Sequence, residues 1–243
     1  MDFMAVRRSE SVSAAVASLK AAGPLAMVLS ARLTNEELYL AGLLSKALKV
    51  SLHDVVPRMG EPDGILIPAD RNPNTAGAQL LGATGKEPGK ALAEIVAGVR
   101  SGAIQGLICL GEDLSECGFN PADLKKLKAL VATSILPTDT TKAAHIVLPG
   151  AAWAEKRGSM INIHGRLQRL NKAVEPADGT RDDWEILRDL LMASGSPVSF
   201  HEIEDVFRAM SQDVPAFAGL NLSKIGDLGV QLLPKPEAAA ATV

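Results

Sequence analysis

Short runs of apolar residues alternate with amphipathic stretches through the first two thirds of the chain. Runs without a polar face are typical of strands that are buried on both sides of a parallel sheet. The runs that we predict as strands occupy residues 24–30, 64–67, 106–110, 130–134 and 145–148. Strands of this kind, separated by helices, predict an α/β fold with a doubly wound, mainly parallel sheet flanked by helices.

Helix signals lie between these runs. Thr34 and Glu37 have the spacing of a capping box, and leucines at helical spacing follow them as far as Leu48. Asn120 followed by Pro121 predicts another helix start, because proline is tolerated at the first helical position. The other predicted helices cover residues 11–21, 91–99, 121–128, 182–193 and 201–210.

Two stretches lack a clear period. Residues 69–90 are rich in Asn, Pro and Gly, so we expect a long loop with one helical turn. After Pro149 the character changes, and residues 151–171 are expected to be an irregular, charged segment. The expected organisation is an N-terminal segment and helix over residues 1–22, one α/β domain over 23–230, and a flexible tail over 231–243.

The amino-acid composition argues against two functional classes, nucleic-acid-binding proteins and membrane-spanning proteins. Aromatic residues make up only 3% of the 243, and the 25 Lys and Arg residues are outnumbered by 28 Asp and Glu. A chain with few aromatics and no basic excess is a poor candidate for binding nucleic acid. The most apolar stretch, residues 21–33, is too short to cross a membrane, so we expect no direct membrane span and a cytoplasmic location.

Familiar catalytic motifs fail on spacing. Gly85-Lys86 lacks both the earlier glycine and the following Ser or Thr of a phosphate-binding loop. Cys109 and Cys117 are too few for an iron–sulfur cluster or a structural zinc site, and they are expected to be inert thiols. The four histidines occur singly, without a second ligand at helical spacing. The residues alone therefore predict no catalytic residue and no metal ligand set.

One segment is too polar for a core and too regular for a linker. It reads Glu155-Lys-Arg-Gly-Ser-Met-Ile-Asn-Ile-His-Gly-Arg-Leu-Gln-Arg169, and it lies between the Leu148-Pro149 strand end and an Asp183-Trp-Glu-Ile-Leu187 motif. That order resembles the molybdopterin oxidoreductase superfamily. More narrowly, Asp70-Arg-Asn-Pro-Asn74 with Gly77-Ala78 is similar to a loop of the large iron–sulfur subunit of respiratory complex I, the NADH–quinone oxidoreductase. The resemblance runs from about residue 23 to 229.

The resemblance implies a part in electron transport. In the superfamily this α/β domain helps to hold a molybdopterin guanine dinucleotide, whereas in the complex I subunit the corresponding portion is regarded as having lost its cofactor. The implied function is a non-catalytic structural component of an NADH–quinone oxidoreductase, with no cofactor bound by this chain alone. The implied partners are other hydrophilic subunits, which would hold the chain at the inner membrane periphery. The chain departs from the superfamily pattern in two ways. It lacks the cysteine motifs of the clusters and the metal ligand, and it has His145 and His164 at positions where relatives usually have acidic residues.

An alternative hypothesis is that the chain still binds the molybdopterin cofactor. The chain would then be one part of a split, formate-dehydrogenase-like molybdopterin oxidoreductase, binding part of the guanine dinucleotide together with a cysteine-containing partner chain. Under this hypothesis Asn162, Gly165, Arg166 and Gln168 are candidate cofactor contacts. A competing interpretation is that the polar side chains, with Glu155, pair internally to fix a long loop. In neither case is the chain expected to be catalytic alone.

A third hypothesis rests on the fold only. A free-standing α/β domain would bind a small nucleotide-like ligand at the carboxyl ends of its strands. Trp184 and Leu187 are expected to pack the helix over residues 182–193 onto the sheet rather than to recognise a ligand.

Overall fold

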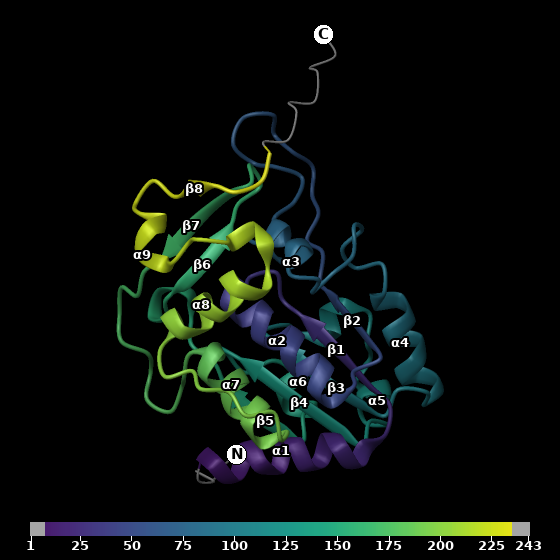
Figure 1. Ribbon diagram of the computed structural model, residues 1–243. Helices are drawn as coiled ribbons and strands as arrows, with labels where there is room; N and C mark the ends of the chain where they lie inside the picture. Colours follow the sequence, from purple (N-terminus) through teal and green to yellow (C-terminus); the bar gives the residue numbers. More distant parts are fainter. Residues whose placement is uncertain (1–7, 235–243) are drawn as a thin grey trace.

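A five-stranded parallel sheet forms the centre of the molecule, in a computed structural model that describes residues 8–234 (Figure 1). The strand order is β2-β1-β3-β4-β5, and every neighbouring pair is parallel. The predicted α/β fold is therefore confirmed. The strands are β1 Leu25–Leu29, β2 Leu52–Val55, β3 Gly106–Leu110, β4 Ala129–Ser134 and β5 Ile146–Pro149.

Helices cover both faces of this sheet, which explains why its strands are apolar throughout. Met27 and Ile108 belong to one core, together with α1, α2, α7 and α8. Val28 and Leu107 belong to a second core, together with α4 and α5. The α-helices are α1 Arg8–Ala22, α2 Asn35–Leu48, α3 Thr75–Leu80, α4 Leu92–Ser101, α5 Pro121–Leu124, α6 Asp139–Ala143, α7 Asp183–Ala193, α8 Ile203–Asp213 and α9 Leu222–Ile225.

Most helix predictions hold, with small differences at the ends. The capping box at Thr34 and Glu37 is present at the start of α2. The helix predicted for residues 121–128 is a single turn, α5, capped as expected by the Asn120 side chain. Helix α1 packs against α7 and β4, so it shares the larger core with the sheet.

The strand predicted for residues 64–67 is wrong. These residues form an exposed turn, in which the Asp63 carboxylate accepts hydrogen bonds from the backbone of Ile65, Leu66 and Ile67. The strand beside β1 at this edge of the sheet is β2 instead, which the apolar pattern does not reveal because two of its four residues, His53 and Asp54, are polar. That carboxylate is buried but satisfied, since it accepts hydrogen bonds from the Thr84 hydroxyl and from two backbone amides at the approach to α4.

The segment expected to be irregular, residues 151–171, contains two strands. β6 Gly158–Ile161 and β7 Arg166–Leu170 form an antiparallel hairpin, and β8 Val230–Gln231 adds a third strand. Ile161 and Leu167 pair across the hairpin and are fully buried in the larger core. Short strands with only two such apolar positions carry little periodicity, which is why the pattern along the sequence was too weak to indicate them.

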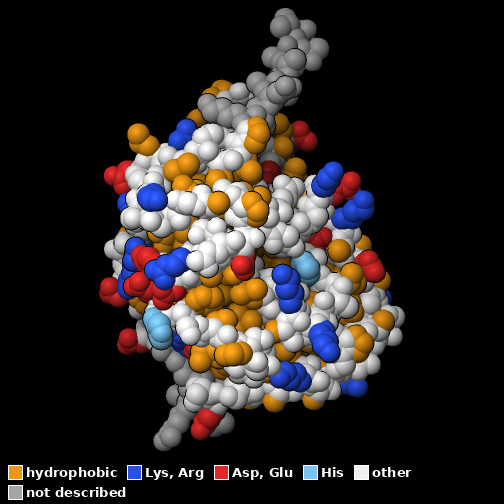
Figure 2. Space-filling model, viewed as in Figure 1, with side chains coloured by type: hydrophobic (Ala, Val, Ile, Leu, Met, Phe, Trp, Pro, Cys, Tyr) orange, Lys and Arg blue, Asp and Glu red, His pale blue; other side chains and the backbone are white. Residues whose placement is uncertain are grey.

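The start of the expected flexible tail is ordered. Gln231 belongs to β8, and the amides of Leu232 and Leu233 donate hydrogen bonds to the Gly165 carbonyl. Residues 235–243 of the tail and residues 1–7 of the N-terminal segment lie outside the described residues. Within residues 8–234, no helix is long and apolar enough to cross a membrane. Figure 2 shows acidic and basic side chains intermingled on one face, without a continuous basic surface there.

Candidate functional site

A cavity of about 430 Å³ lies at the carboxyl ends of the parallel strands; we call it the carboxyl-edge cavity. The strand order reverses between β1 and β3, so the cavity lies at the switch point where open α/β sheets bind ligands. The volume is within the range of about 300–1,000 Å³ that small-molecule sites occupy. Its lining includes Ser30 and Arg32 after β1, Gly111, Glu112, Asp113 and Glu116 after β3, Thr133, Ser134 and Thr138 in and after β4, and Arg58, Lys156 and Asp183.

Two arginines of the cavity meet on one buried carboxylate. Arg58 donates to both oxygens of Glu112, with Nη1 lying 2.9 Å from Oε1. Arg32 Nη2 lies 3.4 Å from Glu112 Oε2 and 2.8 Å from the Gly111 carbonyl oxygen. The hydrogen bond to Glu112 raises the pKa of Arg58 above its ordinary value. The cavity rim thus carries two fixed guanidinium groups, of which Arg32 is the more exposed.

Thr133, in β4, has an unsatisfied hydroxyl. The residue is 1% exposed, and its Oγ1 has no hydrogen-bond partner in the part of the chain that the structure describes. Buried polar atoms are almost always hydrogen-bonded, because an unpaired one costs about 1–3 kcal/mol. Thr133 lines the cavity, so an unsatisfied hydroxyl lies at the cavity wall.

A buried ion cluster connects the floor of this cavity to α2 and α7. Lys156 Nζ lies 2.8 Å from Glu37 Oε1 and 3.1 Å from Asp183 Oδ2, and all three side chains are at most 8% exposed. Burial by itself would lower the pKa of Lys156, but the two carboxylates outweigh it and raise that pKa. The Glu37 carboxylate also accepts a hydrogen bond from the Thr34 amide as part of the capping box. The same carboxylate therefore caps the start of α2 and forms the ion pair with Lys156.

A second buried carboxylate, that of Glu36, fastens the hairpin to the same helix end. It accepts hydrogen bonds from the Ser159 amide at 2.9 Å and from the Ser159 hydroxyl at 2.8 Å. Burial raises the pKa of Glu36 to about 7. The sequence analysis missed this role, because acids in the first turn of a helix are favoured there even on a surface and do not indicate burial.

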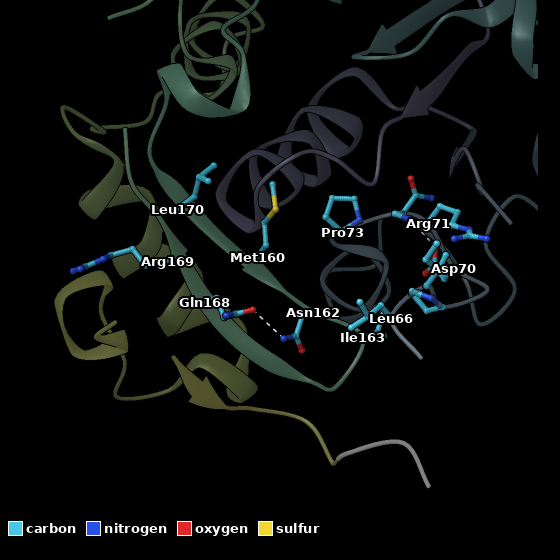
Figure 3. A pocket seen from close by; sticks show the side chains of 13 residues that line it. Leu66, Asp70, Arg71, Pro73, Met160, Asn162, Ile163, Gln168, Arg169 and Leu170 are labelled. Carbon is cyan, nitrogen blue, oxygen red and sulfur yellow. Dashed lines mark hydrogen bonds between the residues drawn. The ribbon is translucent and has the colours of Figure 1, made fainter. Parts of the chain in front are cut away.

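The second cavity, of about 590 Å³, lies between the loop over residues 66–73 and the β6–β7 hairpin; we call it the hairpin cavity (Figure 3). It receives two of the four candidate cofactor contacts. Asn162 Nδ2 donates to Gln168 Oε1 at 2.9 Å, so the two amides face each other across the hairpin. Met160, Ile163 and Leu66 make much of the remaining lining apolar.

The other two candidates are engaged by the chain itself. The Gly165 carbonyl accepts the Leu232 and Leu233 amides, and Arg166 Nη1 donates to the Leu228 carbonyl at 3.0 Å. Asn162 Oδ1 accepts the amides of His164 and Arg166, as the internal-pairing interpretation predicts. Glu155 is not part of this network; its carboxylate accepts the Ala152 amide.

The histidine, cysteine and tryptophan residues that the sequence analysis singled out lie in the interior or bond to the chain itself. His145 Nδ1 accepts the Leu130 amide at 2.9 Å. Burial raises the pKa of the Cys109 thiol, and it raises the pKa of the Cys117 thiol to about 12. Trp184 and Leu187 are buried in the core, as predicted. Within residues 8–234, no group of three His, Cys, Asp or Glu side chains is arranged to hold a metal ion.

The comparison with protein families decides the assignment. The family model described as molybdopterin oxidoreductase matches residues 11–193. The chain belongs to the molybdopterin oxidoreductase family. The resemblance on residues 155–169 is therefore confirmed at family level.

Individual relatives within the molybdopterin oxidoreductase family are much longer proteins. The F420-dependent formate dehydrogenase 2 subunit alpha of Methanococcus maripaludis is 34% identical over 134 residues, which are 53% of this chain and 20% of the relative. The NADPH-Fe(3+) oxidoreductase subunit alpha of Geobacter sulfurreducens is 33% identical over 149 residues, or 59% of this chain and 17% of the relative. Formate dehydrogenase H of Escherichia coli is 26% identical over 132 residues, covering 53% of this chain and 18% of the relative.

These matches revise the narrower resemblance. Several of these relatives are alpha subunits of formate dehydrogenases, so the similarity is to this group rather than specifically to the large iron–sulfur subunit of complex I. The chain matches only about a fifth of the length of these relatives. Among solved structures, acetylene hydratase from Pelobacter acetylenicus matches with a TM-score of 0.43 and 15% identity, over 59% of this chain and 21% of the other.

Proposed function

We propose that this chain is the cofactor-binding α/β module of a formate-dehydrogenase-type molybdopterin oxidoreductase, and that it is not catalytic by itself. It would hold the nucleotide part of a molybdopterin guanine dinucleotide in the carboxyl-edge cavity. A partner chain would supply the remaining parts of the enzyme. The observation that carries the proposal is Thr133, whose buried hydroxyl has no partner within residues 8–234 and which lines a cavity of ligand size at the switch point of the sheet.

The residues of the cavity fit a nucleotide. Of the hydroxyl groups in the lining, that of Ser30 already accepts from Arg32 and that of Ser134 donates to the Leu136 carbonyl, so Thr133 is the one offered to ribose or base atoms among the described residues. Arg32 offers a partly exposed guanidinium group for a phosphate. Glu112 holds both arginines in place, so their guanidinium groups are positioned before a ligand arrives. The same lining also contains the carboxylates of Glu112, Asp113, Glu116 and Asp183. When bound, the pterin cofactor would supply the metal-centred redox chemistry, while this chain binds and orients it.

The relatives give more support to this proposal than to a structural role in an NADH–quinone oxidoreductase. Their names include formate dehydrogenases of Methanococcus, Methanocaldococcus and Escherichia coli. Asn162, Gly165, Arg166 and Gln168 remain alternative contacts for the cofactor. Because Gly165 and Arg166 are engaged with the C-terminal segment, we assign the nucleotide to the carboxyl-edge cavity first.

Two measurements on the full chain test the proposal. Native purification of a tagged copy should recover molybdenum or tungsten together with pterin fluorescence in the assembly. Titration of the purified chain with guanosine diphosphate should give saturable binding, weakened about fivefold to tenfold by Thr133→Val, since one hydrogen bond contributes about 1 kcal/mol. Thr180→Val, outside both cavities, is the matched control.

The outcomes separate the candidate sites. An assembly without metal and pterin would contradict cofactor binding. Weakened guanosine diphosphate binding in Gln168→Ala but not in Thr133→Val would instead move the nucleotide to the hairpin cavity.

A further inference from the structure

Basic side chains gather at the edge of the parallel sheet where its strands begin, opposite the carboxyl-edge cavity. The segments that lead into β1, β2, β3 and β4, residues 18–24, 45–51, 100–105 and 121–128, contain seven Lys and Arg residues and a single Asp. The seven are all exposed, and we call them the amino-edge cluster: Lys20, Lys46, Lys49, Arg100, Lys125, Lys126 and Lys128. Because the whole chain has a net charge of -3, the remainder of the molecule is strongly acidic.

The four strand starts lie side by side, so the charges of the amino-edge cluster share one surface. The Ser51 amide donates to the Leu25 carbonyl at 2.9 Å, and the Lys128 amide donates to the Gln105 carbonyl at 2.8 Å. Neighbouring strands are about 4.8 Å apart, so the four starts span about 15 Å. Charges act over about 10 Å at 0.1 M salt, so the fields of these cations add. The lower right part of Figure 2, where α2 and α4 end, shows separate Lys and Arg side chains with no acidic side chain among them.

The topology of the sheet brings these cations together. Helices between parallel strands run back across the sheet, so α1, α2 and α4 all end at the amino edge, and helix dipoles favour cations at such ends. The first-turn acids of the same helices, such as Glu10 and Glu94, lie at the opposite ends. Asp123 pairs with Arg100 and Lys126, at 3.2 and 2.9 Å. Four members of the cluster form no ion pair within residues 8–234: Lys46, Lys49, Lys125 and Lys128.

Lys49 presents its charge from a strained backbone position. It is the C-cap of α2 and has a φ of 55°, and within residues 8–234 every other residue with a positive φ is glycine. Glycine adopts this left-handed conformation without strain and is the usual residue there. The lysine gains no ion pair among the described residues, so the strain is not offset by a contact within the chain. Such strain is expected where a side chain serves an outside partner.

We propose that the amino-edge cluster binds the surface of an anionic lipid bilayer. Clusters of Lys and Arg are attracted to anionic headgroups, and each residue strengthens binding about fivefold. The segments that carry the cluster have no exposed large apolar side chain, so they lack the anchors on which protein–protein interfaces depend. A bilayer surface needs only the charge, which favours lipid over an acidic protein. The proposal does not depend on the carboxyl-edge cavity, which lies at the other edge of the sheet.

Cosedimentation of the purified full chain with lipid vesicles tests this proposal. At about 0.1 M salt the chain should bind vesicles of phosphatidylcholine with about 30% phosphatidylglycerol but not phosphatidylcholine alone, and about 0.5 M salt should release it. The double variant Lys49→Glu/Lys128→Glu should weaken binding at least about twentyfold, since each lysine contributes about fivefold. Lys86→Glu/Lys90→Glu is the matched control, because it changes the net charge equally at exposed positions outside the cluster, and it should bind nearly as tightly as the wild type.

A further variant separates lipid binding from folding. Lys49→Gly removes both the charge and the backbone strain, so the midpoint of thermal unfolding should rise while vesicle affinity falls about fivefold. Unchanged vesicle affinity in a folded Lys49→Gly variant would exclude Lys49 from the contact and overturn the proposal.

The remaining outcomes also overturn lipid binding. Equal binding to both kinds of vesicle would mean that headgroup charge is not recognised, and equal weakening by the two double variants would mean that only net charge matters. A chain that ignores vesicles but is retained on immobilised polyglutamate through the same lysines would assign the edge to an acidic polypeptide. Failure to bind guanosine diphosphate would contradict the proposed function and leave the vesicle result unaffected.

Discussion

Lys156 Nζ lies 2.8 Å from Glu37 Oε1, although the two residues are 119 positions apart in the chain. The contact joins the start of α2 to the segment that leads into the β6–β7 hairpin, and Asp183 completes it from the start of α7. One ammonium group therefore connects three elements at the floor of the carboxyl-edge cavity. Its burial makes the cluster a sensitive point for stability, because each charge depends on the others.

Replacing Lys156 should destabilise the fold strongly. Lys156→Met leaves the carboxylates of Glu37 and Asp183 buried without a cation, and we expect a loss of about 3–5 kcal/mol in the free energy of unfolding. Urea denaturation followed by circular dichroism measures this. Lys142→Met removes a surface pair with Asp139 and should cost less than about 1 kcal/mol. Equal losses for the two variants would contradict the importance of burial.

Glu36 should make stability depend on pH. Its pKa is raised from 4.5 to about 7 in the folded protein, so the folded state holds a proton that the unfolded state has lost. Its contribution is fully present below about pH 4.5 and disappears as the pH rises to about 7, a change of about 3 kcal/mol. Glu36→Gln should flatten this part of the profile, whereas exposed Glu94→Gln should not. Parallel profiles for the wild type and Glu36→Gln would exclude Glu36 as the titrating group.

Gly77, in α3, is required by a close approach to two asparagine side chains. A Cβ at this position would lie 2.2 Å from both Asn35 Oδ1 and Asn74 Oδ1. Because Asn74 Oδ1 accepts the Ile161 amide, moving it would loosen β6, and Gly77→Ala should cost about 1–3 kcal/mol. Gly42→Ala, in α2 with nothing within 4 Å, should instead stabilise by about 0.5–1 kcal/mol. Thermal unfolding of both variants tests the contrast, which fails if the two shifts have the same sign.

Thr133 should show a conflict between stability and binding. Thr133→Val removes the unpaired buried hydroxyl, so the ligand-free chain should gain about 1 kcal/mol while guanosine diphosphate binding weakens. Thr140→Val is the contrasting variant, because the Thr140 hydroxyl donates to Asp113 Oδ1 at 2.8 Å and accepts the Leu114 amide. That variant should lose about 1–3 kcal/mol. Destabilisation by Thr133→Val would mean that its hydroxyl is already satisfied, for example by water.

The sequence by itself determined the fold class and most of the elements. Apolar runs at 24–30, 106–110 and 130–134 were predicted correctly because strands buried on both faces have no polar side to conceal them. The polar motif over residues 155–169 also identified the family, which the match to residues 11–193 confirms.

Only the tertiary structure decided which polar residues are buried and which apolar residues are exposed. Asp54 lies in a strand because distant amides satisfy its carboxylate, and Ile65 lies on the surface because Asp63 bends the chain into a turn. The pattern of apolar and polar residues around one position does not show these hydrogen-bond partners. The partners of Asp54 come from segments far along the chain, and the turn at Ile65 depends on the direction of a single side chain. The same reason hid the cluster around Lys156 and the unpaired hydroxyl of Thr133: both are defined by what surrounds them in space.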